Sequence, residues 1–111
     1  MFAALALCAP VSLTAFAQAP AGDAKSPVGD AKAGAQKVQT CQGCHGIPGW
    51  RTAYPEVYHV PKINGQHTLY FVSALKAYKS GARQHPSMRA IATALSDQDM
   101  ADLAAYYAEA K

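Results

Sequence analysis

The stretch from Thr40 to Gly46 reads TCQGCHG, so that two cysteines are separated by two residues and a histidine directly follows the second. This motif, Cys41-Gln-Gly-Cys44-His45, constrains the chain more than any other feature. A Cys-x-x-Cys pair is typical of redox proteins, of zinc proteins and of proteins that attach haem covalently. These proteins place the pair in different contexts, so the rest of the chain must distinguish among them.

Haem attachment accounts for more of the motif than the alternatives do. A structural zinc ion needs four ligands, and the only other cysteine is Cys8, near the start of the chain. A thioredoxin-like pair needs a helix that begins at the first cysteine, whereas we expect one that ends there. A plain disulfide between Cys41 and Cys44 is the remaining alternative, but its small loop gains little entropically and leaves His45 without a role. In haem attachment both thiols add to vinyl groups and His45 becomes the proximal ligand of the iron.

The composition also favours a bound cofactor. The chain has 111 residues, half of them apolar, and many of these are alanine, so large core side chains are few. Such a short chain buries little surface and often depends on a cross-link or a cofactor. A covalently bound porphyrin would supply the missing bulk. The formal net charge of +3 comes without a basic run, so the sequence predicts no nucleic-acid partner.

The N-terminal segment has the features of an export signal. Residues 1–17 carry no charge and end in Ala-Phe-Ala at 15–17, the small-x-small pattern of a signal-peptide cleavage site. We expect a signal peptide there, with an uncleaved membrane anchor as the alternative. Residues 18–28 are rich in Pro, Gly, Ala and Ser and predict a linker. The functional domain is then expected at 29–111, in the periplasm.

Two segments in the first part of this domain have helical character. Residues 30–40 open with an acidic side chain at the positive end of a helix dipole and place Gly34 on an expected contact face. Residues 66–80 are followed by Gly81 as a helix cap and space apolar residues at three- and four-residue steps: Leu69, Val72 and Leu75.

The last segment has the clearest helical pattern. Ser96 and Asp99 form a capping box, and an apolar stripe follows it at i, i+3, i+4 and i+7: Met100, Leu103, Ala104 and Tyr107. Asp102 and Glu109 are expected on the opposite, outer side. No run alternates with period two, and the prolines, including Pro86, are expected in loops. The sequence therefore predicts an all-α domain.

Several segments follow one another in an order that resembles a known family. Residues 29–34 read GDAKAG, and the attachment motif is followed by PKINGQ at 61–66, SMRAIA at 87–92 and LSDQDMADLAAY at 95–106. This pattern resembles the class I c-type cytochromes, in particular the bacterial group of cytochrome c-553 and the single domains of periplasmic dihaem cytochromes c. The resemblance implies a small helical domain wrapped around one covalently attached haem c. The chain has one attachment motif, so we expect a monohaem protein.

The resemblance also implies the residues that hold the haem. It places the distal iron ligand at Met88, opposite His45, and a thioether raises the reduction potential relative to a second histidine. Met100 and His85 are the rivals of Met88. The backbone carbonyl of Pro61 is expected to accept the Nδ1 hydrogen of His45 and orient the ring. The expected haem-binding residues are thus Cys41, Cys44, His45, Pro61 and Met88, with His45 and Met88 as the metal ligands.

Other polar and aromatic side chains lack a defined role at this stage. Trp50 either lines the haem or lies at the surface. Close packing of Gly34 against Tyr106 or Tyr107 is implied by the family and is also ordinary helix packing. Candidate partners of the haem propionates are Arg51, Tyr54, Tyr58, Lys62 and Arg83.

Filled axial positions leave an iron no site for substrate, so the sequence predicts an electron carrier rather than an enzyme. Its partners would be larger redox proteins that dock through a small, transient interface. Membrane contact is expected only if the leader is retained. The alternatives are a haem subunit fixed in a dehydrogenase or oxidase complex, and a ligand-binding or peroxidase-like haem protein in which Met88 is not bound.

Overall fold

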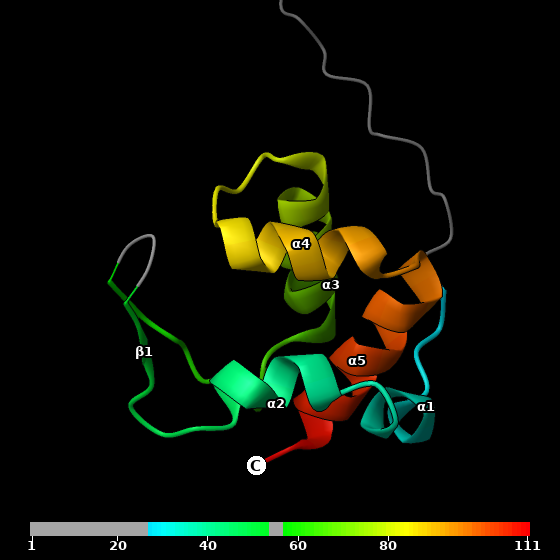
Figure 1. Ribbon diagram of the computed structural model, residues 1–111. Coiled ribbons are helices and arrows are strands. Elements are labelled where there is room, and N and C mark those ends of the chain that lie inside the picture. The colour runs from blue at the N-terminus through cyan, green and yellow to red at the C-terminus, as the bar shows by residue number, and fades with distance from the viewer. Residues whose placement is uncertain (1–26, 54–56) are drawn as a thin grey trace, which may run out of the picture.

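The computed structural model describes residues 27–53 and 57–111, so the expected signal peptide, residues 18–26 of the linker and Tyr54 lie outside the described residues. The described residues form five helices (Figure 1): α1 (Ala31–Ala35), α2 (Gln39–His45), α3 (Thr68–Ser80), α4 (Pro86–Ala94) and α5 (Asp97–Glu109). The only extended pairing in these residues joins β1 (Arg51–Thr52) to β2 (Tyr58–His59), antiparallel, with Arg51 opposite His59. The expected all-α class is confirmed. In the described ranges, no helix is both long and apolar enough to cross a membrane.

The expected helix at 30–40 is two helices. α1 begins after Asp30, whose carboxylate accepts the Lys32 amide at 2.8 Å, and it ends at Ala35. A turn then buries Val38 in the core, and α2 runs from Gln39 to His45. The prediction that a helix ends at the first cysteine is therefore wrong, since α2 contains the whole attachment motif. The turn between α1 and α2 places the side chain of Val38 in the core.

α1 packs closely against α5, near the C-terminus (Figure 1). A methyl group on Gly34 would overlap the carbonyl oxygen of Asp102 and lie 2.8 Å from Cβ of Tyr106. Only a glycine allows the two helices to approach this closely. Of the two tyrosines expected near Gly34, Tyr106 and Tyr107, the structure places Tyr106 against it.

α3 supplies two buried side chains to the core. Phe71 and Leu75 are each 7% exposed, and the ring of Phe71 stacks on that of Tyr107 with centroids 5.4 Å apart. Leu69, expected on the apolar stripe, is instead 80% exposed. The helix ends as predicted at Gly81, whose φ of 85° is a left-handed conformation that glycine adopts without steric cost.

The helix α4 differs from the sequence prediction, which places Pro86 in a loop. Pro86 instead occupies the first turn of this helix, where its restricted φ is favourable and its missing N–H is not needed. The side chain of His85 caps the helix by accepting the Met88 amide at 3.4 Å. Met88 therefore projects from a helix rather than from a loop.

α5 begins at the predicted capping box. The Asp99 amide donates to the Ser96 hydroxyl at 3.1 Å, and the Ser96 amide donates to the Asp99 carboxylate at 3.0 Å. Met100 and Leu103 are fully buried, as the apolar stripe predicted. The core also contains Val38, Phe71, Leu75, Ala92, Ala104 and Tyr107.

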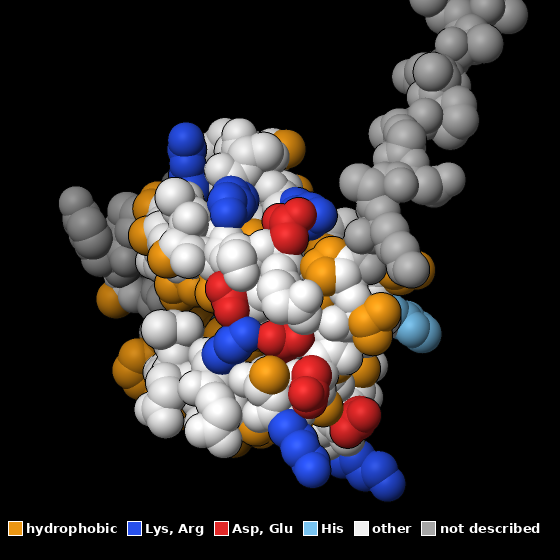
Figure 2. Space-filling view, turned by 90° about the vertical axis from the view of Figure 1, so that its right-hand side faces the viewer, with side chains coloured by type: hydrophobic (Ala, Val, Ile, Leu, Met, Phe, Trp, Pro, Cys, Tyr) orange, Lys and Arg blue, Asp and Glu red, His pale blue; other side chains and the backbone are white. Residues whose placement is uncertain are grey.

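Asp102 does not lie on an outer face, so that prediction is wrong. It is 3% exposed, because the start of the domain and α1 cover this side of α5. Its carboxylate accepts hydrogen bonds from the Asp30 amide at 2.9 Å and from Lys37 Nζ at 2.6 Å. The Gln98 amide adds a third at 2.8 Å. Figure 2 shows acidic and basic side chains gathered closely on this face.

Candidate functional site

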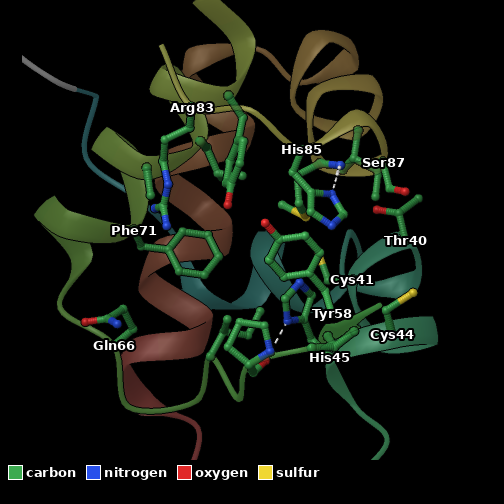
Figure 3. Close-up of a pocket in the computed structure, with 18 of the residues that line it drawn as sticks. Thr40, Cys41, Cys44, His45, Tyr58, Gln66, Phe71, Arg83, His85 and Ser87 are labelled. Atoms are coloured by element: carbon green, nitrogen blue, oxygen red, sulfur yellow. Dashed lines mark hydrogen bonds between the residues drawn. The ribbon is translucent and has the colours of Figure 1, made fainter. Parts of the chain in front are cut away.

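A pocket of about 540 Å³ lies between α2, the β hairpin, α3 and α4 (Figure 3). All five of the expected haem-binding residues line it: Cys41, Cys44, His45, Pro61 and Met88. Its walls are rich in apolar side chains, including Ile63, Phe71, Leu75, Ile91 and Leu95. A largely apolar cavity with a few convergent polar groups is typical of a cofactor site.

The histidine of the motif has a defined orientation. His45 is the last residue of α2, and its Nδ1 lies 2.7 Å from the carbonyl oxygen of Pro61. The carbonyl can only accept, so Nδ1 carries the hydrogen and donates it. The other ring nitrogen, Nε2, is then unprotonated in the neutral imidazole and available as a metal ligand.

The two cysteines of the motif lie in different environments. Cys44 is exposed, whereas Cys41 is half-buried and packs against the core. Burial raises the pKa of the Cys41 thiol. Burial also raises the pKa of the neighbouring Tyr107 hydroxyl. Both cysteines nevertheless line the same pocket.

Of the three candidate distal ligands, two line the pocket. Met88 is partly buried on α4, and His85 lies just before that helix with its ring 5.3 Å from Tyr58 in an edge-to-face arrangement. Met100 is fully buried in the core and does not line the pocket. The tertiary structure thus separates the core methionine from the one that is able to reach a cofactor.

The remaining polar candidates divide between pocket and surface. Tyr58, Lys62 and Arg83 line the pocket. Arg51 does not, and its Nε donates to Nε2 of His59 at 2.9 Å across the hairpin. Trp50 is 43% exposed and lies outside the lining.

Sequence reasoning missed part of the lining. His59 comes from the hairpin, and Tyr70 and Tyr78 come from α3. The spacing of Phe71, Leu75 and Tyr78 at i, i+4 and i+7 was an available signal for the pocket face of that helix. No comparable local pattern marked His59.

The donor atoms of the pocket match covalently bound haem. Two thiols lie on one helix beside an oriented imidazole, and a thioether is supplied by another helix. Imidazole and thioether are ligands that bind haem iron. Residues 27–53 and 57–111 contain no group of three or more His, Cys, Asp or Glu side chains that could hold a separate metal ion.

Comparison with known proteins identifies the family. Residues 31–111 match the family model described as cytochrome c. The chain belongs to the cytochrome c family. It is 44% identical over 82 residues to cytochrome c-554(548) of Halomonas halodenitrificans, covering 71% of this chain and 94% of that protein.

Members named cytochrome c4 are longer than the aligned region. The protein of Pseudomonas aeruginosa is 41% identical over 83 residues, which cover 75% of this chain and 39% of that protein. The crystal structure of reduced recombinant cytochrome c4 from Pseudomonas stutzeri superposes with a TM-score of 0.60 and 35% identity, over 76% of this chain and 47% of that one. The chain therefore spans less than half of these c4 relatives.

Family membership confirms the cofactor predicted from the motif and the all-α fold class predicted from the helical segments. The protein is a class I c-type cytochrome with a covalently bound haem c and its iron, in an all-α domain. The residues that line the described pocket fit a haem, because they include both cysteines of the attachment motif.

Proposed function

We propose that this protein is a periplasmic electron carrier whose single haem is ligated by His45 and Met88. The observation that carries the proposal is that the imidazole and the thioether both line the pocket containing Cys41 and Cys44. When bound, the haem supplies an iron that accepts and releases one electron.

The chain's own residues then have distinct roles. The sulfurs of Cys41 and Cys44 hold the cofactor through thioether bonds, so it is not lost between oxidation states. The Pro61 carbonyl keeps the His45 ring in one orientation. Its hydrogen bond with the ring also makes the imidazole a stronger electron donor to the iron, as such hydrogen bonds to ligating histidines generally do. The Met88 sulfur, which lines the same pocket, would be the second side-chain ligand of the iron. No position is then left for a substrate, which favours a carrier over an enzyme.

The surroundings of the pocket are compatible with contact to a redox protein. Tyr58 is 49% exposed and Tyr70 is 51% exposed, and both line the pocket. A partner that covers these rings would approach the cofactor without entering the core. A small interface of this kind suits rapid, transient docking.

Absorption spectra of the purified protein test the proposal. We expect a low-spin ferric spectrum with the weak charge-transfer band of an iron–sulfur bond, and a ferrous protein that does not bind carbon monoxide. A high-spin ferric spectrum, or rapid carbon monoxide binding by the parent protein, would replace the carrier with the ligand-binding or peroxidase-like alternative. A haem subunit fixed in a larger complex would share the carrier's spectrum but co-purify with its complex.

Export is a separate part of the proposal. Residues 1–17 act as a signal peptide and residues 18–28 link it to the domain at 29–111, so the mature chain begins near Gln18. The intact mass of periplasmic protein should equal that of this shortened chain plus one haem. A membrane-bound product that retains Met1 would indicate an uncleaved anchor instead.

A further inference from the structure

The charged side chains that line the pocket are all of one sign. Lys62 and Arg83 are the only Lys or Arg residues in the lining, and the described part of the pocket contains no Asp or Glu. Opposite charges attract strongly where water is partly excluded. The pocket is therefore suited to a ligand that carries negative groups on an otherwise apolar body.

Arg83 is held in position at this pocket by its neighbours. Its guanidinium carbon lies 4.8 Å from the centre of the Tyr78 ring, a cation–π distance. One of its terminal nitrogens, Nη1, lies 3.4 Å from the Tyr70 hydroxyl, and its backbone amide donates to Ala77 at 3.0 Å. Figure 3 shows the side chain beside Phe71, on the α3 side of the pocket.

Arg83 lacks an acidic partner within residues 27–53 and 57–111. The ion pairs of those residues involve Lys37 and Lys76. A guanidinium has five N–H donors in a planar fork that matches a carboxylate with two parallel hydrogen bonds. Stacking on Tyr78 reduces the conformational freedom that such a pairing would otherwise cost.

The other propionate candidates are less well placed. Arg51 is engaged with His59 and lies outside the pocket lining. The Tyr58 ring contacts His85. Lys62 also lines the pocket and is exposed, as Arg83 is, but its ammonium is a point charge without the two parallel donors of a guanidinium.

We propose that Arg83 binds one propionate carboxylate of the haem and keeps it ionised. The inference rests on the haem-binding pocket of the proposed function but not on which side chain fills the distal iron position. Pairing with a fixed cation favours the charged form of a carboxyl group. A positive charge held near the haem also favours ferrous over ferric iron.

The direct test is ¹³C NMR of the holoprotein with haem labelled at the propionate carboxyl carbons. Spectra are recorded in the diamagnetic ferrous state, with carbon monoxide added if the ferrous iron proves to be high-spin. In the parent, one of the two carboxyl signals should titrate at lower pH than the other. Arg83→Gln should move that signal's titration to higher pH, and Arg83→Lys should have a smaller effect.

The readout belongs to the propionates alone, although other ionisable groups line the same pocket: His45, Tyr58, His59, Lys62, Tyr70, Tyr78 and His85. These groups are present in the parent and in every variant. Arg89→Gln is the matched control, because Arg89 is an exposed α4 arginine outside the pocket lining. The reduction potential at neutral pH should fall in Arg83→Gln and remain near that of the parent in Arg89→Gln.

Two results would overturn the proposal. One is an identical titration of both carboxyl signals in the parent and in Arg83→Gln. The other is an equal shift in Arg83→Gln and Arg89→Gln, which would indicate a general effect of net charge. If Arg83→Gln does not retain haem, the comparison of the parent with Arg83→Lys decides, and unchanged signals there reject the pairing. A parent that binds carbon monoxide would contradict the carrier function but leave this test valid.

Discussion

His45 Nδ1 lies 2.7 Å from the carbonyl oxygen of Pro61, sixteen residues further along the chain. This hydrogen bond joins the end of α2 to the segment that follows the hairpin. Pro61→Gly should loosen that segment and weaken the bond, which makes the imidazole a poorer donor and raises the reduction potential. Redox titration of Pro61→Gly against Pro61→Ala, which retains more backbone restriction, measures the effect. A potential that is equal in the two variants would contradict it.

Met88→Ala should open the distal position of the iron. Removal of the thioether should lower the reduction potential, since methionine ligation raises it. The ferrous variant should bind carbon monoxide readily, and the ferric variant should gain peroxidase activity. His85→Ala is the control, because it keeps Met88 and removes only a pocket histidine that caps α4. An unchanged axial spectrum in Met88→Ala would rule out Met88 as the ligand.

Met100→Ala should lower stability without changing the axial spectrum. The side chain is fully buried in the core, away from the pocket lining. Such a truncation leaves a cavity that costs about 2–5 kcal/mol of unfolding free energy. Urea unfolding of the holoprotein, followed by far-ultraviolet circular dichroism, measures that loss. Loss of the iron–sulfur charge-transfer band in this variant would instead make Met100 the distal ligand.

Gly34→Ala should be strongly destabilising because α1 and α5 have no space for a methyl group at this crossing. The added carbon would overlap the Asp102 carbonyl oxygen and approach Cβ of Tyr106. Overpacking of this kind costs about 1–3 kcal/mol or more. Gly43→Ala in α2 is the matched control, since no described protein atom outside its own helix turn lies within 4 Å of the new methyl group. Equal unfolding midpoints for the two variants would contradict this account of the crossing.

The buried Asp102 should make stability depend on acid pH. Hydrogen bonds from Lys37, the Asp30 amide and Gln98 hold the pKa of this carboxyl below its ordinary value. A carboxyl group whose pKa is lowered on folding stabilises the fold at pH values above its pKa in the unfolded chain, about 3.9. This contribution is lost as the pH falls through the lower pKa of the folded state. The free energy of unfolding should therefore change little between about pH 5 and 7 through this group and decrease at lower pH.

Comparison of the parent with Asp102→Asn separates this contribution from other effects of acid on stability. The variant should be less stable at neutral pH and should lose less stability on acidification. Asp97→Asn is the control, because its ion pair with Lys76 is exposed and such pairs contribute little. Parallel pH profiles for the parent and Asp102→Asn would show that the Asp102 network does not couple to folding.

Features that depend on neighbours in the sequence were predictable. Cys41, Cys44 and His45 lie within about one and a half turns of a helix, so the sequence alone predicts their common role in haem binding. The Ser96–Asp99 capping box and the Gly81 cap are also local, because they satisfy backbone groups a few residues away. Family resemblance, rather than any local pattern, supplied Pro61 and Met88 as site residues.

Tertiary structure decided the features that depend on which segment covers which face. Asp102 is buried because α1 and the start of the domain lie over it, and Leu69 is exposed because nothing described covers that side of α3. The same folding brings His59, Tyr78 and Arg83 to one pocket from the hairpin, from α3 and from the segment before α4. Burial and long-range pairing are properties of the packed chain, so a periodic pattern predicts a helix but does not identify the partner of each of its faces.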